Sequence, residues 1–521
     1  MAVRKALGSS SAIYMQKTTA RVCVPVCESS LSNVPLALDQ AAKLADLVEL
    51  RLDCLDAREL PDFDQLDLSR LNKPVILTLR SPDQGGHNHL TVTQRLEFWT
   101  RRLTIDSKLL FDIEFDLLPL IGERSSVDWS RVIVSHHDFN GVPEDIFQIF
   151  ERIVSSPAAI GKIAVTTNDV VDCLPILELL DRARADQKQL IAIGMGSAGV
   201  ITRILGPSRG AFLTYASVST DAGTAPGQIT VEQLRSVYRV DQINTETFVC
   251  GIIGLPVVHS VSPHIHNAAF ARLGLNGVYL PLEVHDVDAF FKRMVRPETR
   301  ELAWNLRGLS VTAPHKSSVI KYLDEVDENA KRIGAVNTIL VENGKLAGYN
   351  TDAEGFLEPL LSKLTSLVDL RVAVLGAGGA ARAVLWALSN QKAAVTLFAR
   401  DPAKGEQLGL DFGVPVKNIV DASFSNFDLV INTTPLGSYG NLVEQSPATR
   451  QQLAGAKLVY DLVYNPRETK FLANGRAAGC DVLSGLDMLV AQAKRQFEMW
   501  TGLAPDTATM MVAAQRGLDM I

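Results

Sequence analysis

Residues 47–53, Leu-Val-Glu-Leu-Arg-Leu-Asp, alternate apolar and charged side chains. Successive side chains of a β-strand point to opposite faces, so this stretch predicts a strand with one apolar and one charged face. Residues 109–116 repeat the pattern. The charged positions of the two stretches are Glu49, Arg51, Asp53, Asp112, Glu114 and Asp116. Charges on the inner face of a closed parallel barrel call for a polar ligand, and we interpret both stretches in this way. Two amphipathic strands of a sandwich are the alternative.

Eight short apolar stretches alternate with helical segments between residues 21 and 240. The predicted strands are 21–27, 47–53, 74–80, 109–116, 131–137, 160–166, 189–194 and 211–215. This regular alternation favours a (β/α)8 TIM barrel over an open sheet. The protein is therefore predicted to be α/β, with the barrel at residues 21–240, a disordered tail at 1–20 and a linker at 241–247.

The second half of the chain predicts a two-lobed α/β unit that ends in helix. Its predicted strands are 248–254, 307–312, 371–375, 394–399, 429–432 and 457–461, and residues 486–521 are predicted to be helical. Residues 376–381, Gly-Ala-Gly-Gly-Ala-Ala, form a tight turn after a strand, as in Rossmann-type cofactor domains. We expect a Rossmann lobe at 366–485 and a substrate lobe at 248–365 plus 486–521.

Composition narrows the class of protein. The net charge of −7 over 521 residues argues against a nucleic-acid partner, and no apolar run is long enough for a membrane helix. Six scattered cysteines without metal-ligand spacing favour a reduced, cytoplasmic protein, and we expect no metal. The first twenty residues contain no acidic side chain, so a short plastid-targeting segment is an alternative to a disordered tail. The sequence does not determine the oligomeric state.

Lys162 lies inside the apolar run 160–166, and His137 ends the preceding predicted strand. Neighbouring strands of a parallel barrel lie about 4.8 Å apart, so these two side chains can share one cavity. An amine beside an imidazole suits imine formation with a ketone, followed by proton abstraction at the adjacent carbon. An ion-paired core lysine and a core histidine are the structural alternatives.

A second group of candidates lies around Lys316 and Asp352. A lysine beside an aspartate can donate a proton during carbonyl reduction, and the hydroxyls of Ser260 and Ser262 can hold a carboxylate. The alternatives are a plain salt bridge for the first pair and a helix N-cap for Ser262. The glycine turn can receive a pyrophosphate or can serve packing alone.

The first segment resembles type I 3-dehydroquinate dehydratase. The resemblance rests on Glu-Leu-Arg-Leu-Asp (49–53), Thr-Leu-Arg (78–80), Ser-His-His-Asp-Phe (135–139), Gly-Lys-Ile-Ala (161–164), Met-Gly-Ser-Ala-Gly-Val-Ile-Thr-Arg (195–203) and Ala-Pro-Gly-Gln (225–228). It implies that Lys162 forms a Schiff base and that His137 is the general acid and base. It further implies substrate contacts by Glu49, Arg51, Arg80, Met195, Arg203, Tyr215, Thr224 and Gln228.

One position departs from the dehydratase pattern. The family usually carries a glutamate before Gly-Gly, near the catalytic histidine, and this chain has Gln84. A glutamine can orient His137 by a hydrogen bond, but it cannot raise the pKa of the imidazole with a negative charge. We therefore expect an active dehydratase with a slower rate or a shifted pH optimum.

From residue 248 to about 517 the chain resembles shikimate dehydrogenase. The motifs include Ser-Val-Thr-Ala-Pro-His-Lys (310–316), Gly-Ala-Val-Asn-Thr (334–338), Gly-Tyr-Asn-Thr-Asp (348–352), Asn-Thr-Thr-Pro-Leu-Gly (432–437) and Gly-Leu-Asp-Met-Leu-Val (485–490). The resemblance assigns Lys316 and Asp352 to catalysis. Its substrate-binding set is Ser260, Ser262, Thr312, Asn337, Tyr464 and Gln492. The cofactor-binding set is Gly376, Ala377, Gly378, Gly379, Ala380, Ala399, Arg400, Asp401, Lys404, Thr433 and Gly485.

The side chains after the second cofactor strand bear on the choice of cofactor. Arg400 and Lys404 can hold a 2′-phosphate, which favours NADP. NADP-specific members usually read Asn-Arg-Thr where this chain reads Ala-Arg-Asp at 399–401. The carboxylate of Asp401 can repel a 2′-phosphate or accept hydrogen bonds from an unphosphorylated ribose. NADP is the prediction, and a preference for NAD would overturn it.

The whole chain thus resembles bifunctional dehydratase–shikimate dehydrogenase fusions. This resemblance implies dehydration of 3-dehydroquinate to 3-dehydroshikimate, followed by NADPH-dependent reduction to shikimate. The expected partners are these small molecules. Two alternatives remain: an NAD-linked quinate/shikimate dehydrogenase with weak dehydratase activity, and a non-catalytic regulator that senses pathway metabolites.

Overall fold

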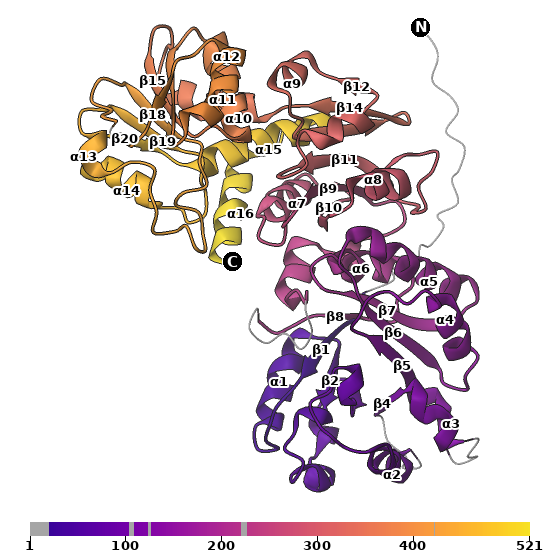
Figure 1. Ribbon diagram of the computed structural model, residues 1–521. Coiled ribbons are helices and arrows are strands. Elements are labelled where there is room, and N and C mark those ends of the chain that lie inside the picture. The colour runs from indigo at the N-terminus through magenta and orange to yellow at the C-terminus, as the bar shows by residue number, and fades with distance from the viewer. Residues whose placement is uncertain (1–19, 104–108, 123–126, 220–226, 421, 521) are drawn as a thin grey trace, which may run out of the picture.

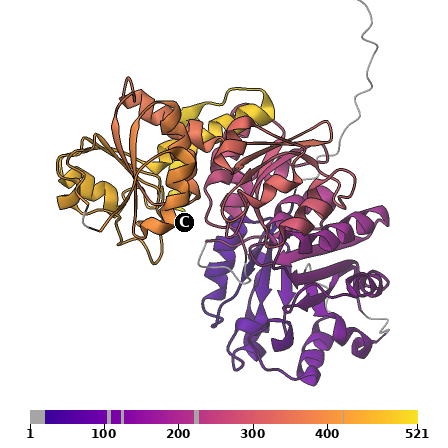
Figure 2. The same ribbon diagram turned by 45° about the horizontal axis from the view of Figure 1, so that its top comes forward.

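The computed structural model describes residues 20–103, 109–122, 127–219, 227–420 and 422–520 (Figure 1). It contains three sheets, and the second lies between the first and the third in both ribbon views (Figures 1 and 2). In the described ranges, no helix combines the length and the apolar character needed to cross a membrane.

The first sheet confirms the predicted barrel. Within the described residues it has eight parallel strands, ordered β7-β6-β5-β4-β3-β2-β1-β8. They are β1 (Val22–Val26), β2 (Leu47–Arg51), β3 (Val75–Thr78), β4 (Leu110–Glu114), β5 (Val132–Asp138), β6 (Ile160–Thr166), β7 (Gln189–Met195) and β8 (Thr214–Tyr215). The barrel closes just before β8, where the Phe212 N–H donates to the Leu190 carbonyl at 2.8 Å. The surrounding helices are α1 (Val34–Leu44), α2 (Val92–Arg102), α3 (Leu118–Ile121), α4 (Ile146–Val154), α5 (Cys173–Ala185) and α6 (Val200–Leu205).

The side chains of β2 alternate between the outer and inner faces of the barrel, as the sequence predicted. Val48 and Leu50 are fully buried against the outer layer, whereas Glu49 points inward and accepts a hydrogen bond from the Thr78 hydroxyl at 2.6 Å. The helices supply the matching apolar surface, as in α4, whose buried residues are Ile146, Ile149, Phe150 and Ile153. This spacing places all four on one helical face toward the strands.

The second sheet has the order β10-β9-β11-β13-β14-β12. Its strands are β9 (Phe248–Gly254), β10 (Gly277–Glu283), β11 (Asn305–Val311), β12 (Glu325–Val326), β13 (Thr338–Glu342) and β14 (Lys345–Tyr349). The sequence analysis missed the β13–β14 hairpin. Its turn residues Asn343 and Gly344 have φ values of 50° and 77°, the conformation that Asn-Gly pairs favour in two-residue hairpins. The helices are α7 (Ser262–Arg272), α8 (Val287–Phe290), α9 (Glu328–Ile333) and α10 (Asp352–Lys363).

The third sheet is the predicted doubly wound one, with parallel strands in the order β17-β16-β15-β18-β19-β20. Its strands are β15 (Arg371–Leu375), β16 (Ala394–Ala399), β17 (Val416–Asn418), β18 (Leu429–Asn432), β19 (Leu458–Asp461) and β20 (Asp481–Leu483). Its helices are α11 (Gly379–Asn390), α12 (Pro402–Phe412), α13 (Arg450–Leu453) and α14 (Lys470–Ala477). Strand order reverses between β15 and β18, and such a switch point is where open α/β sheets bind ligands.

The C-terminal stretch forms two helices where the sequence analysis expected a single helical segment. They are α15 (Gly485–Thr501) and α16 (Thr507–Asp519). Gly502 has φ 71° and ends α15 in the left-handed conformation, and a proline follows at 505. Trp500 Nε1 donates to the Ile339 carbonyl at 3.1 Å, so α15 packs against the second sheet.

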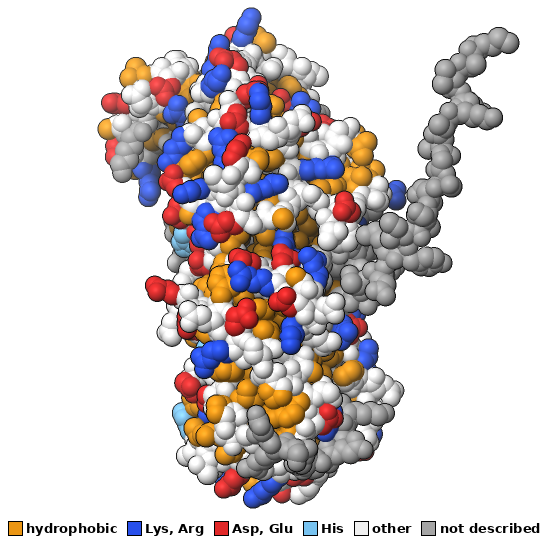
Figure 3. All heavy atoms as spheres, turned by 90° about the vertical axis from the view of Figure 1, so that its right-hand side faces the viewer, with side chains coloured by type: hydrophobic (Ala, Val, Ile, Leu, Met, Phe, Trp, Pro, Cys, Tyr) orange, Lys and Arg blue, Asp and Glu red, His pale blue; other side chains and the backbone are white. Residues whose placement is uncertain are grey.

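The barrel and the second sheet share a continuous apolar core. Polar contacts reinforce this junction, because one carboxylate oxygen of Asp169 accepts the backbone N–H groups of His285 and Asp286, both at 2.8 Å. On the face shown in Figure 3, Lys and Arg side chains are interspersed with Asp and Glu. That mixture is unlike the basic patch of a nucleic-acid-binding surface.

Candidate active sites

Lys162 lies on β6 inside the barrel and is 4% exposed. Its ammonium group donates hydrogen bonds to Asp112 at 2.8 Å, to the Tyr215 hydroxyl at 2.9 Å and to Glu49 at 3.2 Å. The lysine is therefore ion-paired, as the structural alternative expected. Its partners, however, are the inward-facing carboxylates of a barrel interior, where the predicted ketone would bind.

Asp112 joins the lysine to a second cation. Its carboxylate accepts hydrogen bonds from Arg80 at 2.8 Å and from the Ser135 hydroxyl at 2.5 Å. Burial alone would raise the pKa of Asp112, but the charges of Arg80 and Lys162 outweigh burial and lower the pKa to about 2. The sequence analysis placed Asp112 on the inner face but did not include it among the site residues. The alternating pattern of β4 was the signal that could have added it.

His137 lies on β5, next to the strand that carries Lys162. In strand register Ser135 is opposite Lys162, and His137 is opposite Ala164. Burial, followed by the charges of Arg80 and Lys162, lowers the pKa of His137 well below its usual value. Its Nδ1 atom is buried and lacks a hydrogen-bond partner among the described residues. A neutral imidazole with an unpartnered nitrogen is suited to accept a proton.

Gln84, at the end of the short helix η4 (Pro82–Gln84), contacts the backbone of His137 and not its imidazole. The Gln84 Oε1 atom accepts the His137 N–H at 3.1 Å. The expected hydrogen bond between Gln84 and His137 is thus present, but it fixes the backbone of the histidine and leaves the ring free of this contact. A charged side chain at position 84 can still act on the pKa of the His137 imidazole.

A Gln84→Glu substitution is expected to shift the acidic limb of the kcat/KM profile for dehydration to higher pH by about one unit. The added carboxylate would stabilise the imidazolium form and so raise the pKa of His137, and the proton-accepting form would then appear at higher pH. The pH dependence of the second activity of the same chain serves as the control. Superimposable dehydration profiles for the two proteins would rule out this influence.

The other predicted dehydratase contacts surround the same barrel mouth. Arg51 forms two hydrogen bonds with Asp53, at 2.9 and 2.7 Å. Arg203 on α6 is 1% exposed, its Nε atom lacks a partner in the described ranges, and burial lowers its pKa to about 10. A buried guanidinium with an unused donor favours an incoming carboxylate. Met195 and Tyr215 are buried, Gln228 is half-buried, and Thr224 lies outside the described residues.

The second site is a cavity of about 330 Å³ between the second and third sheets. Lys316 donates to Asp352 at 2.6 Å, and the Asn337 amide donates to the other oxygen of Asp352 at 2.8 Å. All eight catalytic and substrate-binding residues predicted for this half line the cavity: Ser260, Ser262, Thr312, Lys316, Asn337, Asp352, Tyr464 and Gln492. The sequence analysis missed His259, Ser310 and Gln496, which line it too.

Ser262 does not cap α7, so the N-cap alternative is wrong. The cap residue is Val261, and Ser262 is the first helical residue. The Ser260 hydroxyl instead accepts the Ser262 N–H at 3.2 Å. Both serines face the cavity, where their hydroxyls can bind a small polar ligand.

The glycine turn between β15 and α11 fits a dinucleotide. Gly376 has φ 107°, which disfavours other residues, and a Cβ atom there would lie 2.6 Å from the Thr434 side chain. At Gly378 and Gly379 a Cβ atom would meet nothing within 4 Å, so these positions leave room for a phosphate to approach the start of α11. The Thr433 hydroxyl holds the turn by donating to the Leu375 carbonyl at 2.8 Å.

The remaining cofactor candidates lie on both sides of this turn. Ala380 and Gly485 line the Lys316 cavity, and Ala377 is half-buried against the apolar core of the third sheet. Ala399 ends β16, and Arg400 and Asp401 follow it as exposed residues. Lys404 lies on α12, and its side chain is outside the described part of the structure.

Known proteins match both halves of the chain. Residues 22–245 match the type I 3-dehydroquinase family, residues 252–339 the shikimate dehydrogenase substrate-binding domain, and residues 485–515 the shikimate 5'-dehydrogenase C-terminal domain. A chloroplastic bifunctional 3-dehydroquinate dehydratase/shikimate dehydrogenase of Arabidopsis thaliana is 33% identical over 94% of this chain and 83% of its own length. The chain belongs to this bifunctional family.

Single-activity relatives of this bifunctional dehydratase–dehydrogenase match its second half. A shikimate dehydrogenase (NADP(+)) of Methanococcus aeolicus is 38% identical over 51% of this chain and 97% of its own length. The solved shikimate 5-dehydrogenase of Thermus thermophilus is 36% identical, with a TM-score of 0.47 over 52% of this chain and 100% of its own.

The cysteines of the bifunctional enzyme are not all reduced, in contrast to the prediction. Cys27 and Cys54 form a disulfide, whereas Cys23, Cys173, Cys250 and Cys480 are free and buried. The two cysteines are 27 residues apart, and this spacing does not indicate a disulfide in the sequence alone. The parallel pairing of β1 and β2 brings the residues after these two strands together.

Proposed function

We propose that this chain dehydrates 3-dehydroquinate in its barrel and reduces the product, 3-dehydroshikimate, to shikimate in the second cavity. The observation that carries the proposal is the presence, in one chain, of a buried lysine among inward-facing carboxylates and a Lys316–Asp352 pair beside a glycine turn. The bifunctional relative supports the pair of reactions, and the shikimate dehydrogenases (NADP(+)) support the reduction.

In the barrel, Lys162 is the nucleophile. Glu49 and Asp112 accept hydrogen bonds from its ammonium group, and Glu49 is placed to take the proton that the nitrogen gives up before it attacks the substrate ketone. The amine adds to the carbonyl, and loss of water gives a protonated imine. His137 takes a proton from the adjacent carbon, and the imine accepts the electron pair. The imidazolium then returns this proton to the hydroxyl on the next carbon, which leaves as water while the electron pair moves back from the nitrogen. Hydrolysis of the imine returns the lysine, so the net change is the loss of one water molecule.

The barrel arginines position the substrate. Arg203 has an unused buried donor, and we assign it to the substrate carboxylate. Arg51 is already held by Asp53, which fixes the plane of its guanidinium at the barrel mouth. Arg80 donates hydrogen bonds to Asp112 and Ser135, and we assign it the role of holding the lysine's carboxylate partner.

In the second site, NADPH bound along the glycine turn would supply the hydride. Lys316 donates a proton to the oxygen of the reduced carbonyl, and Asp352 orients the lysine through their 2.6 Å contact. Asn337 fixes Asp352 in turn, at 2.8 Å. Ser260 and Ser262 bind the carboxylate of the substrate at the start of α7.

NADP is the proposed cofactor, with Arg400 as its 2′-phosphate contact. An Arg400→Ala substitution is expected to lower the NADP-over-NAD preference in kcat/KM about tenfold or more, because a charge-assisted hydrogen bond to the phosphate is lost. An NAD-linked enzyme is the second candidate. The Asp401 side chain makes no capping hydrogen bond on α12, so its carboxylate can accept hydrogen bonds from an unphosphorylated ribose. Steady-state kinetics with both cofactors decides, and a wild-type preference for NAD would contradict the assignment.

A coupled assay tests the whole proposal. The full chain, supplied with 3-dehydroquinate and NADPH, is expected to consume one NADPH for each substrate molecule. A chain that consumes no NADPH with either 3-dehydroquinate or 3-dehydroshikimate would favour the metabolite-sensing regulator.

The domain division and the location of the protein are also proposals. We assign 21–240 to the dehydratase, 248–365 plus 486–521 to the substrate lobe and 366–485 to the NADP lobe. We retain a cytoplasmic location as the proposal, although the Arabidopsis relative is chloroplastic by name. Microscopy of a fluorescent fusion in the source cell would distinguish the two compartments.

A further inference from the structure

The Cys27–Cys54 disulfide lies at the barrel mouth and has no part in the proposed mechanism. Cys27 directly follows β1, and Cys54 ends the short helix η1 (Leu52–Cys54), which follows β2. The carboxyl ends of parallel strands share one edge of a barrel, so both sulfur atoms lie on the side that carries the substrate-binding loops. Cys27 is exposed and Cys54 half-buried, and solutes can therefore reach the pair.

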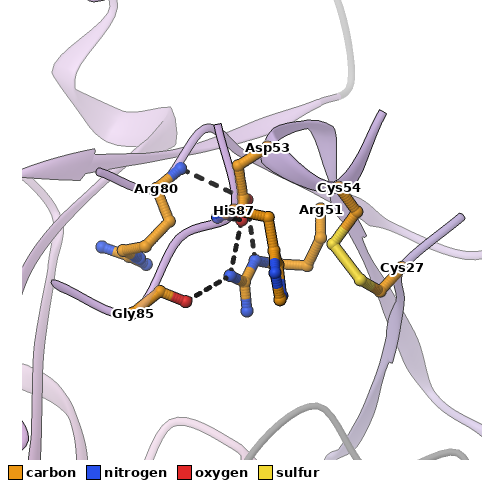
Figure 4. Close-up of a disulfide and its surroundings, with 7 residues drawn as sticks. All are labelled: Cys27, Arg51, Asp53, Cys54, Arg80, Gly85 and His87. Atoms are coloured by element: carbon orange, nitrogen blue, oxygen red, sulfur yellow. Dashed lines mark hydrogen bonds and ion pairs between the residues drawn. A yellow bond between two sulfur atoms is a disulfide. The ribbon is translucent and has the colours of Figure 1, made fainter. Parts of the chain in front are cut away.

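A histidine completes a group of three metal-binding side chains at this corner. One ring nitrogen of His87 and the two sulfur atoms all lie within 4.8 Å of one another. The His87 backbone is anchored, because its N–H donates to Asp53 at 3.2 Å. Figure 4 shows the His87 ring at the barrel mouth together with the disulfide and the Arg51–Asp53 pair. This hydrogen bond fixes the backbone of His87 at the corner that carries the two cysteines.

Two thiolates and one imidazole form the donor set that Zn²⁺ prefers. Zinc binds sulfur at about 2.3 Å and nitrogen at about 2.0–2.1 Å, so tetrahedral ligand atoms lie roughly 3.5–4 Å apart. Opening the S–S bond lets the two sulfur atoms move apart to this spacing, and the His87 nitrogen lies within 4.8 Å of both. Three protein ligands leave a fourth position for water.

We propose that reduced Cys27 and Cys54, together with His87, bind one Zn²⁺ ion, and that disulfide and metal site are alternative states of this corner. A dithiol reductant supplies the two electrons and two protons that convert the S–S bond into two thiols, and is itself oxidised to a disulfide. Zinc then displaces the two thiol protons. A small disulfide can reverse the change: it accepts two electrons from the two thiolates, is reduced to thiols, and re-forms the Cys27–Cys54 bond. The ion is then released, because the same sulfur atoms cannot bind zinc and each other. This inference does not depend on the proposed function.

The test uses the untagged full chain and Co²⁺ as the spectroscopic probe. The protein is reduced with a dithiol, desalted without oxygen and titrated with Co²⁺. We expect the reduced chain to bind one equivalent of Co²⁺ and to show sulfur-to-cobalt charge-transfer absorption. Added Zn²⁺ should abolish this absorption, and the oxidised chain should not show it. The four free cysteines are at most 7% exposed and are shielded from the probe.

Three variants locate the site. C27S/C54S is expected to lose the absorption, H87Q to bind about tenfold more weakly or worse, and H89Q, a matched exposed histidine two residues away, to bind like wild type. Circular dichroism and thermal unfolding confirm that each variant is folded. Absence of charge-transfer absorption in the reduced wild type, its persistence in C27S/C54S, or unchanged affinity in H87Q would overturn the proposal.

Discussion

Replacing Lys162 by alanine is expected to reduce dehydration of 3-dehydroquinate by about four orders of magnitude or more, while NADP-linked shikimate oxidation continues. The reaction requires a covalent imine, and among the described residues no other lysine amine contacts the carboxylates of the barrel interior. The two activities are measured separately on the same purified protein, so the dehydrogenase reports on folding.

The alanine variant has a structural cost that a second variant controls. Removal of the ammonium group leaves Glu49 without its cation, and breaking a buried ion pair costs about 3–5 kcal/mol. Lys162→Arg keeps a positive charge between Glu49 and Asp112 but cannot form an imine. We expect it to be as inactive as the alanine variant and more stable to thermal unfolding. Substantial dehydration by the arginine variant would contradict the covalent role.

Replacing Lys316 by alanine is expected to lower kcat for the reduction of 3-dehydroshikimate by about 10²–10⁴-fold, the usual contribution of a positioned proton donor. The dehydratase activity should not change, because the lysine lies in a separate cavity. Stopped-time assays with purified 3-dehydroshikimate and NADPH give the rate of this step alone.

The aspartate variant distinguishes donation from positioning. Asp352→Asn removes the charge opposite Lys316 and keeps a similar shape, so we expect a smaller loss than in Lys316→Ala. The Lys316 variant should retain its KM for shikimate within a few-fold, since the serines and Asn337 remain. An equal fall in both activities of either variant would indicate misfolding and would contradict a local role.

Alternation and motif order predicted most of the fold. The charged face of residues 47–53 placed Glu49 inside a barrel. In the structure Glu49 accepts a hydrogen bond from Lys162 across the interior. A contact between Glu49 and Lys162 could be anticipated, because the side chains that point into a closed barrel share one small interior. The predicted glycine turn is present, and the space around Gly378 and Gly379 is compatible with the pyrophosphate that the sequence analysis expected there.

Features that depend on tertiary contacts could not be predicted in this way. Cys27, Cys54 and His87 come from three separate segments, whose approach is set by strand pairing and by the paths of the chain after the strands. The hydrogen bond of Gln84 to a backbone amide depends on a loop conformation that composition does not specify. The β13–β14 hairpin was a different case, because its Asn-Gly turn was a visible signal that was overlooked.

Reduction of the chain with borohydride in the presence of 3-dehydroquinate tests the central claim most directly. The imine at Lys162 should be converted into a stable secondary amine, and peptide mass spectrometry should find the added mass on the peptide that contains this residue. Dehydratase activity should fall in proportion to labelling while shikimate oxidation persists. A protein that dehydrates the substrate without any trapped adduct, or with the adduct on another lysine, would contradict the account.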